Sequence, residues 1–303
     1  MKIFDKLFKV VRNPRLIGVR FMERTAKCWS DELFLKWMFY FRMGRPLNLK
    51  HPTAYNDKLQ WLKLNYRRNI MTDLVDKYKV KDYVRKLIGD EYIIPTLGVY
   101  DSVDAIDFDS LPDQFVLKCT HDSGGIVVCK DKVSLDINKA KRKMAWALNR
   151  TYYYENREWP YKNVKRAIIA EKYMEDESGY ELKDYKFFCF DGKPRFLFVA
   201  TDRPVDTRFD FFDLEWNHLP FKQGHPHASR SIPCPKNFQK MVELATILSK
   251  GFPNVRVDLY NCDGKIYFGE MTFSHFSGMV PFEPSEWDEK IGEMLQLPES
   301  TVE

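Results

Sequence analysis

The stretch NVRVDLYNCDGKIYFGEMTF, residues 254–273, contains two apolar segments on either side of a turn. Along its first half, side chains alternate between two faces, so Arg256 and Asp258 share one face and aliphatic residues occupy the other. Glu270 and Thr272 alternate in the same way on the return segment. The stretch therefore predicts a β-hairpin with one apolar face and polar groups along each of its strands.

The length of the turn decides whether these polar groups share one face. The sequence Asn261-Cys262-Asp263-Gly264 suits a three-residue loop, in which a type I turn is followed by a glycine in the left-handed conformation. That register predicts one shared polar face, whereas a two-residue loop would put the acids on opposite faces. Two carboxylates beside an arginine and a hydroxyl form a site that suits Mg²⁺ and phosphates. The alternative is a solvent-facing strand with ordinary ion pairs.

A glycine-containing loop follows an earlier apolar segment. Lys118 ends the strand-like sequence FVLK, and the sequence HDSGG brings Ser123, Gly124 and Gly125 directly after it. Glycines let backbone N–H groups approach a phosphate, and a lysine adds a positive charge. The loop is not a Walker A motif, because GxxxxGK[ST] is absent. An ordinary hairpin loop is the alternative.

The sequence RAIIAEKYM, residues 166–174, predicts a buried strand whose end is charged. Glu171 and Lys172 follow its apolar residues directly. A strand that leaves a core in this way can offer backbone groups to the edge of an adenine. The alternative is an edge strand with a solvated end.

The remaining patterns alternate between helical and strand periodicity, and hairpins dominate the strands. They predict an α+β fold with mostly antiparallel sheets. Helices are expected over residues 31–41, 55–66, 72–89, 134–150 and 237–250, strands over 91–100, 113–119, 166–174 and 183–202, and a long connection over 201–235.

Composition excludes several classes of protein. The chain has 303 residues, of which 44% are hydrophobic and 30% are charged, so it is able to bury a sizeable core. No uncharged apolar run approaches the roughly 20 residues that span a bilayer. The six cysteines form no C-x-x-C motif, which favours free thiols in a reducing cytoplasm.

Positive charge is concentrated at the start of the chain. Residues 1–50 hold 12 Lys and Arg against 4 Asp and Glu, while the whole chain has a formal net charge of +5. Residues 3–12 predict a short amphipathic helix with a basic face, which is typical of contact with an anionic membrane surface. The alternative is a helix that packs on the body of the protein. We expect no nucleic-acid partner, since the rest of the chain is nearly neutral.

The order of these segments resembles the ATP-grasp superfamily, to which D-alanine–D-alanine ligase belongs. A helix with Lys77 is followed by the strand with Lys118, the glycine loop, the strand with Glu171 and the hairpin of residues 254–273. The nearest resemblance is to the TupA-like ATP-grasp family of cell-surface polysaccharide gene clusters, whose namesake is linked to teichuronopeptide biosynthesis. It spans about residues 30–297.

The resemblance implies an ATP-grasp fold, in which two α+β subdomains clasp ATP. We expect a basic helical region over residues 1–70, a smaller subdomain with a preceding helix and strand over 71–182, and a C-terminal subdomain with the metal site over 183–303.

The resemblance also assigns roles in binding ATP. These residues resemble those that hold the phosphates, cover them, contact adenine largely through main-chain groups, or bind the ribose: Lys77, Lys118, Ser123, Gly124, Gly125, Glu171, Lys172, Tyr173, Met174 and Asp184.

Magnesium binding and catalysis are assigned to residues near the C-terminus. Asp258, Glu270 and Thr272 resemble the Mg²⁺ ligands, although many relatives have E-x-N where this chain has E-M-T. A threonine is a shorter neutral ligand than asparagine, so a second ion is expected to bind through water or less tightly. The residues that resemble groups steadying a transferred phosphoryl or an oxyanion are Arg256, Lys186 and Gly278.

The resemblance implies an ADP-forming carboxylate–amine ligase that uses ATP and Mg²⁺. Its substrates would be a uronic acid of a glycan or glycan precursor and an amino acid or peptide, and it would act in the cytoplasm at the inner face of the membrane. One alternative is a glycosyltransferase of a polysaccharide cluster. The other is a degenerate nucleotide-binding module at the membrane surface.

Two further patterns favour ordinary structure. The sequence His225-Pro226-His227 would suit a metal, but no third ligand is evident from the sequence, so a loop is the preferred interpretation. The sequence Asp107-Phe108-Asp109 imitates a glycosyltransferase D-x-D motif without a nucleotide-sugar fold around it.

Overall fold

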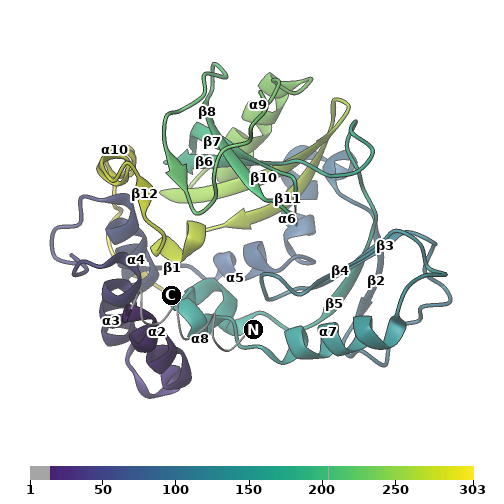
Figure 1. The fold of residues 1–303 in the computed structure, drawn as a ribbon, viewed down its shortest axis with the longest axis horizontal. Helices are drawn as coiled ribbons and strands as arrows, with labels where there is room; N and C mark the ends of the chain where they lie inside the picture. The colour runs from purple at the N-terminus through teal and green to yellow at the C-terminus, as the bar shows by residue number, and fades with distance from the viewer. Residues whose placement is uncertain (1–13, 204) are drawn as a thin grey trace.

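The computed structural model describes residues 14–203 and 205–303 and contains two main antiparallel sheets with helices packed against them (Figure 1). The larger sheet has the order β11-β10-β6-β7-β8, and the smaller one has the order β2-β5-β3-β4. The predicted α+β class is therefore confirmed. The amphipathic helix predicted over residues 3–12 lies outside the described residues. Within the described ranges, no helix is long and apolar enough to cross a membrane.

The strands and helices have the following bounds. The larger sheet consists of β6 (Asp184–Phe190), β7 (Lys193–Thr201), β8 (Arg208–Asp213), β10 (Asn254–Cys262) and β11 (Lys265–Thr272). The smaller sheet consists of β2 (Thr96–Tyr100), β3 (Phe115–Cys119), β4 (Ile126–Cys129) and β5 (Ile168–Lys172). Two short pairs join β1 (Tyr66–Arg67) to β13 (Thr301–Val302) and β9 (Lys222–Gln223) to β12 (Phe282–Glu283). The α-helices are α2 (Arg15–Arg24), α3 (Asp31–Met43), α4 (Tyr55–Asn65), α5 (Ile70–Val75), α6 (Val80–Ile88), α7 (Ile137–Asn149), α8 (Tyr153–Asn156), α9 (Phe238–Ser249) and α10 (Glu286–Met294).

The larger sheet has a core on each face, which is why residues 187–190 of β6 are all apolar and do not alternate. Phe187 belongs to a core that includes residues of α9 and α6, whereas Phe188 belongs to a core that includes residues of α4 and α10. Every residue of β6 is buried. The buried face of α9 carries Met241, Leu244 and Leu248, a spacing that keeps apolar side chains on one side of a helix.

The smaller sheet packs on α7, as the sequence predicts. Asp136 begins this helix, since its carboxylate accepts a hydrogen bond from the backbone N–H of Lys139 at 2.8 Å. Ala140, Met144 and Ala147 then face the sheet and are buried. Figure 1 shows α7 on the outer side of this sheet, away from the larger one.

The helix predicted over residues 72–89 is two helices, α5 and α6. Asp76 interrupts it, because its carboxylate accepts hydrogen bonds from the backbone N–H groups of Tyr78 at 2.9 Å and Lys79 at 3.2 Å. A short acidic side chain competes in this way with the helical hydrogen-bond pattern and starts a new helix. Lys77 therefore lies between α5 and α6 rather than on a helix face.

The prediction of a three-residue turn in the last hairpin is wrong. Cys262 pairs with Lys265, so the loop has two residues, Asp263 and Gly264, with φ angles of 52° and 94°. Positive φ at both positions is typical of a type I′ turn. By itself this loop would put the acids of the two strands on opposite faces.

A β-bulge at Gly269 restores the predicted shared face. Leu259 pairs with Phe268, but Asp258 pairs with Glu270, so one extra residue lies in β11 between these pairs. A Cβ atom on Gly269 would lie 3.0 Å from the backbone oxygen of Asp258, so the bulge favours glycine. The four polar side chains share a face because of the bulge and not because of the turn.

The connection predicted over residues 201–235 contains β8, the edge strand of the five-stranded sheet. β8 pairs with β7 and buries Phe209 and Phe211 in the core beside α4. Alternation of aromatic and polar residues in RFDFFD fits an edge strand, but the flanking prolines and charges favoured a loop.

The proposed division of the chain at residues 71 and 183 stays a prediction. Residues of α5 and α6 join the core of the larger sheet, and residues between 106 and 147 form the core of the smaller one together with Ile168 and Ala170.

Candidate active site

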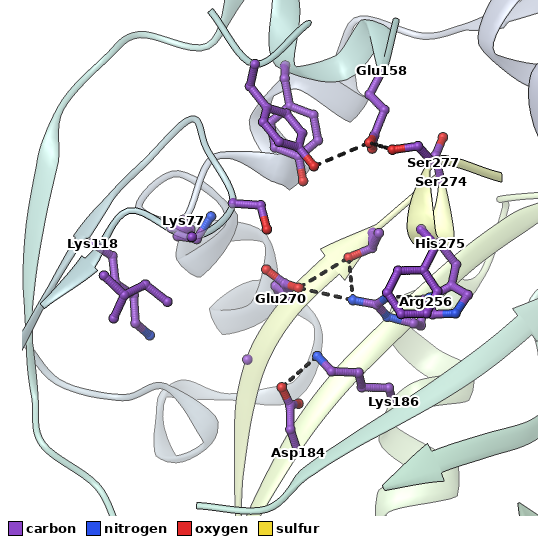
Figure 2. A pocket seen from close by; sticks show the side chains of 18 of the residues that line it. Lys77, Lys118, Glu158, Asp184, Lys186, Arg256, Glu270, Ser274, His275 and Ser277 are labelled. Carbon is purple, nitrogen blue, oxygen red and sulfur yellow. Dashed lines mark hydrogen bonds and ion pairs between the residues drawn. The ribbon is translucent and has the colours of Figure 1, made fainter. Parts of the chain in front are cut away.

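A cavity of about 480 Å³ lies between the polar face of β10 and β11 and the strands of the smaller sheet (Figure 2). It has the volume of a small-molecule site. Its wall contains many of the predicted residues: Lys77, Lys118, Ser123, Gly124, Glu171, Asp184, Lys186, Arg256, Glu270 and Thr272.

Arg256 lies at the centre of the hydrogen-bond network on the hairpin. Its Nε and Nη2 atoms donate to the two carboxylate oxygens of Asp258 at 2.7 and 2.8 Å. Nη2 also donates to Oε1 of Glu270 at 3.1 Å and to Oγ1 of Thr272 at 3.0 Å. Although burial disfavours the charged guanidinium, these acids raise the pKa of Arg256 above its usual range. The guanidinium is thus fixed in one orientation on the polar face.

Asp258 lies behind the cavity wall. It is fully buried and pairs across β10 and β6 with Lys186, whose ammonium contacts its Oδ2 atom. Both carboxylate oxygens are therefore occupied, by Arg256 on one side and by Arg256 and Lys186 on the other. Burial raises the pKa of Asp258 despite these two cations. The residue orients its neighbours and does not itself line the cavity.

Glu270 presents its carboxylate to the cavity instead. Its side chain is 36% exposed, and in the part of the chain that the structure describes its hydrogen bonds use only Oε1. Burial of the group raises its pKa, but Lys186, Lys77 and Arg256 outweigh this and lower the pKa of Glu270 to about 2. An ionised carboxylate with a free oxygen beside a threonine hydroxyl suits a hard cation such as Mg²⁺.

Two lysines share one carboxylate on the opposite wall. Glu171 accepts from Lys118 at 2.8 Å through Oε2 and pairs with Lys81 at 2.5 Å through Oε1. Burial disfavours the charged form of Lys118, but the carboxylate of Glu171 outweighs this and raises the pKa of Lys118 above its usual value. Glu171 therefore has a side-chain contact with the predicted phosphate-binding lysine, where main-chain contacts with adenine were expected. Lys81, on α6, was not predicted, because its apolar neighbours indicated an ordinary helix face.

The glycine loop is held at its base and open at its tip. Lys77 Nζ donates to the backbone oxygen of Asp122 at 2.6 Å, and the carboxylate of Asp122 pairs with Arg150 at 3.2 Å. Ser123 and Gly124 are exposed and line the cavity. Gly124 has a φ of 98°, and a Cβ atom added to it would meet no described atom within 4 Å, so conformation rather than space favours glycine there.

Asp184 lines the cavity and has one carboxylate oxygen without a partner among the described residues. Its Oδ2 atom pairs with Lys186 at 2.6 Å and with Arg203 at 3.2 Å. Its Oδ1 atom is buried and has no hydrogen-bond partner among the described residues. A buried carboxylate oxygen without a donor is able to accept a ligand hydroxyl. Arg203, which orients this carboxylate, was not predicted.

The end of the cavity near η4 (His275–Gly278) contains a buried acid that sequence analysis missed. Glu158 is 4% exposed and accepts from Ser277 Oγ at 2.5 Å and from the hydroxyl of Tyr152 at 3.4 Å. Burial raises the pKa of Glu158 above its usual value. Beside Glu158, the rings of Tyr152 and Tyr161 pack edge to face with their centroids 4.8 Å apart. Figure 2 shows Glu158 and Ser277 on the far side of Arg256 from Asp184.

His275 connects this end of the cavity to Arg256. Arg256 Nη1 lies 2.7 Å from His275 Nδ1, and His275 Nε2 lies 3.0 Å from Oε1 of Gln223. Because an arginine only donates, Nδ1 accepts and the proton is on Nε2. Burial and the charge of Arg256 lower the pKa of His275 well below its usual value. The imidazole is neutral and orients the guanidinium.

Six predicted residues are not brought to the cavity wall. Gly125 packs against α7, and the remaining five are the strand-end residues after Glu171, the buried aspartate and the glycine of η4: Lys172, Tyr173, Met174, Asp258 and Gly278. Among the described residues, Gly278 lies against Gln60, so a Cβ there would meet that side chain at 2.4 Å.

The TupA-like ATP-grasp family model matches residues 57–296. The chain belongs to this family. No curated protein matches the chain. Membership in the TupA-like ATP-grasp family confirms the predicted resemblance, and the α+β architecture agrees with the predicted class.

Solved structures with a similar course of the chain are ATP-grasp ligases of low sequence identity. A D-alanine–D-alanine ligase from Bacillus anthracis, complexed with ATP, is 17% identical with a TM-score of 0.41, over 74% of this chain and 63% of that one. The enzyme from Helicobacter pylori is 12% identical with a TM-score of 0.40, over 82% and 68%. An N5-carboxyaminoimidazole synthase from Aspergillus clavatus is 15% identical with a TM-score of 0.39, over 69% and 46%. The chain thus spans less than two thirds of the first of these proteins.

The site predicts that Lys77 contributes strongly to nucleotide affinity. Lys77→Met removes an ammonium that lies on the cavity wall and holds the glycine loop. A lost charge-assisted hydrogen bond costs about 1.5–3 kcal/mol, so we expect ATP to bind at least about tenfold more weakly by isothermal titration calorimetry. Lys79→Met is the matched control, because Lys79 is exposed and pairs with Asp73. Equal affinity for ATP in the two variants would contradict this role for Lys77.

The lowered pKa of Glu270 predicts a contribution to acid stability. Its pKa is about 2 in the folded protein against an ordinary value of 4.5, so the unfolded chain binds the proton first as the pH falls. The stabilisation is complete above about pH 4.5 and is lost as the pH falls toward 2. The free energy of unfolding, measured with urea at pH 6 and pH 3, should therefore fall less in Glu270→Gln than in the wild type. Glu286→Gln, which changes an exposed carboxylate on α10, should behave like the wild type.

Proposed function

We propose that this chain is an ATP-dependent carboxylate–amine ligase that forms an amide through an acyl phosphate and releases ADP and phosphate. One observation carries the proposal. Lys77, Lys118 and the glycine loop face Arg256 and Glu270 across a single cavity. Cations on one wall and an ordered arginine with an ionised carboxylate on the other suit a phosphoryl group in transfer. Membership in the TupA-like ATP-grasp family supports the same assignment.

ATP would bind with its phosphates between the two walls. Lys77 and Lys118 supply positive charge, and the exposed tip of the glycine loop supplies backbone N–H groups. The unpaired Oδ1 atom of Asp184 would accept a ribose hydroxyl. The side chain of Glu171 holds Lys118 in place.

Magnesium fits this arrangement at Glu270 and Thr272. These residues offer a carboxylate oxygen and a hydroxyl beside the phosphate-binding lysines, which is the ligand type that Mg²⁺ shares with nucleotide phosphates. When bound, the ion neutralises phosphate charge. Asp258 fits the ion less well, because Arg256 and Lys186 occupy both of its oxygens.

The residues of the chain then orient the reacting groups. A substrate carboxylate oxygen attacks the γ-phosphorus and the bond to the β-phosphate oxygen breaks, which leaves ADP and an acyl phosphate. Arg256, held by Asp258 and His275, lies where it balances charge on the transferred phosphoryl. Closure of the loop at Gly124 would exclude water, which otherwise hydrolyses the acyl phosphate.

Glu158 is the proposed partner of the amine. A buried carboxylate at the end of the cavity away from Asp184 suits an ammonium group, and its raised pKa suits removal of a proton. The ammonium would give one proton to Glu158, and the neutral nitrogen would then attack the acyl carbon and release phosphate. Tyr152 and Tyr161 give this end of the cavity an amphipathic wall.

We propose the substrate class by analogy with the family and not from the cavity. The resemblance supports an amino acid or peptide as the amine and a uronic acid of a cell-surface polysaccharide or its precursor as the carboxylate. The proposed place of action is the inner face of the cytoplasmic membrane, where the basic N-terminal segment would contact anionic lipid. Binding of the intact protein to anionic vesicles at low salt tests that contact, and unchanged partitioning after deletion of residues 1–12 would overturn it.

The mechanism predicts that hydroxylamine intercepts the acyl phosphate. With ATP, Mg²⁺ and a uronic-acid substrate but no amine, hydroxylamine should yield a hydroxamate together with one ADP and one phosphate. Mass spectrometry of the hydroxamate and chromatography of the nucleotides measure both products. A screen of uronic acids and amino acids identifies the pair that supports turnover.

Two results would overturn this mechanism. AMP and pyrophosphate as products would show adenylation of the carboxylate instead. Transfer of a sugar from a nucleotide-sugar without ATP would show a glycosyltransferase. A matched Glu270→Gln sample, which keeps the fold but lacks the exposed carboxylate, provides the baseline for ADP release.

Glu158→Gln should separate the two half-reactions. We expect the KM for the amine to rise at least about tenfold, because a charged partner of the ammonium is lost. Hydroxamate formation should change little, since hydroxylamine is neutral and needs no such partner. Glu175→Gln, at an exposed position outside the cavity, is the control. An equal loss of both reactions would assign Glu158 to the fold or to the nucleotide site.

A further inference from the structure

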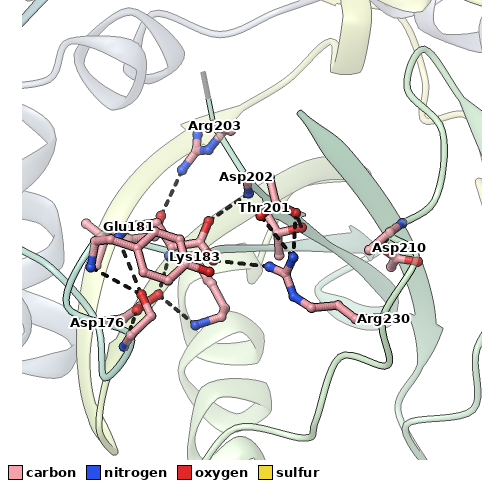
Figure 3. Close-up of polar contacts among 12 residues, drawn as sticks. Asp176, Glu181, Lys183, Thr201, Asp202, Arg203, Asp210 and Arg230 are labelled. Carbon is pink, nitrogen blue, oxygen red and sulfur yellow. Dashed lines mark hydrogen bonds and ion pairs between the residues drawn. The ribbon is translucent and has the colours of Figure 1, made fainter. Parts of the chain in front are cut away.

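A second group of polar side chains lies on the edge strand β8. Figure 3 shows Asp210 beside a cluster of ion pairs in which Arg230 Nη1 contacts both carboxylate oxygens of Asp202 at 2.9 Å. Asp210 is buried but takes no part in that cluster. It lies on the face of β8 opposite Phe209, which lines the ATP cavity, so it belongs to a different site.

We propose that Asp210, His218 and His227 bind a divalent transition-metal ion, with Zn²⁺ the best fit. One ligand atom of each side chain lies within 4.8 Å of the other two. Zinc with imidazole and carboxylate ligands needs bonds of about 2.0–2.2 Å, so small side-chain rotations close the site. The His-Pro-His sequence supplies one ligand, and β8 and the turn that follows β8 supply the others.

The tautomer of His227 leaves one ring nitrogen free for the ion. Its Nε2 atom lies 2.8 Å from the backbone oxygen of Phe221. A carbonyl only accepts, so Nε2 carries the proton and Nδ1 keeps its lone pair. A metal-bound histidine commonly donates its other N–H to a carbonyl in this way, which fixes the orientation of the ring.

Asp210 is oriented in a similar way. Its Oδ2 atom accepts from the backbone N–H of Ala228 at 3.0 Å, and its Oδ1 atom lies 3.0 Å from His218 Nε2. The side chain of His218 is 41% exposed and is able to rotate. Binding replaces this contact: the ring proton of neutral His218 moves from Nε2 to Nδ1 through solvent, and the freed Nε2 lone pair and Oδ1 both ligate the ion.

Backbone pairing holds the three segments together before an ion binds. Phe212 bridges to His218 across the turn after β8, and the N–H of Phe209 donates to the backbone oxygen of Pro226 at 3.0 Å. Asp213 closes the turn by accepting from the N–H of Asn217 at 2.7 Å. The ligands are therefore prearranged by the sheet.

The ion would order a segment that reaches the candidate active site. Gln223 lies between the two histidines in sequence, and its side chain contacts His275, the neighbour of Arg256. Two imidazoles with one carboxylate favour Zn²⁺ over Mg²⁺, which prefers oxygen ligands. Three protein ligands leave a fourth position for water.

Zinc titration of the chelator-treated protein, without ATP, tests the site. We expect one Zn²⁺ per chain by calorimetry and a higher melting temperature with Zn²⁺. Asp210→Asn, His218→Gln and His227→Gln should each weaken Zn²⁺ binding at least about tenfold. His225→Gln is the matched control and should bind like the wild type.

The variants keep the proposal falsifiable if one of them fails to fold. His218 is exposed, so His218→Gln is expected to keep the circular dichroism spectrum and the ATP affinity of the wild type. Glu270→Gln should retain Zn²⁺ binding, which separates this site from the magnesium site. Absence of Zn²⁺ binding in the wild type, or equal binding in His218→Gln, would overturn the proposal.

Discussion

The guanidinium of Arg256 is the group on which the rest of the site depends. It donates to Asp258, Glu270 and Thr272 on the hairpin and is oriented by His275 of η4. Removing one partner of such a buried network leaves an uncompensated charge, which is far more costly than any surface ion pair. The network also determines which carboxylate faces the ligand. Asp258 is turned inward to hold the arginine, and Glu270 is left at the wall of the cavity.

The larger sheet provides the environment that makes this network effective. One of its faces carries phenylalanines such as Phe188 and Phe198 and then changes, along the same strands, to Lys186 and Asp184. The packed aromatic rings exclude water from one side of the charges, and a low local dielectric strengthens their interactions. The same exclusion holds His275 neutral, so that it accepts from Arg256 and does not compete with it. Function and core packing therefore share one sheet face.

The cavity joins two structural units with opposite contributions. The smaller sheet and the segment between α5 and α6 bring Lys118 and Lys77, while the hairpin of the larger sheet brings Glu270 and Arg256. Glu171 lies among these lysines, and its buried carboxylate compensates the charges of both Lys118 and Lys81. Lys77 and Lys118 on one wall and Arg256 on the other give anionic groups such as phosphates a place between them.

The sequence alone determined the α+β class and the helices over α3, α4, α7 and α9. These follow from local patterns, since alternation, helical spacing and capping depend on near neighbours in the chain. The family resemblance added ten of the residues on the cavity wall. The sequence also predicted one polar face for Arg256 and Glu270, but from a turn that is shorter in the structure. Only the tertiary structure decided that a bulge at Gly269 aligns the face, that Asp258 points inward, and that Glu158, His275 and Lys81 join the cavity. It likewise brought Asp210 and His218 close to His227. The spacing of residues in the sequence did not identify these two side chains as ligands for the same ion. Such contacts join residues tens to hundreds of positions apart, and their geometry depends on how sheets pack and register, which no local pattern encodes.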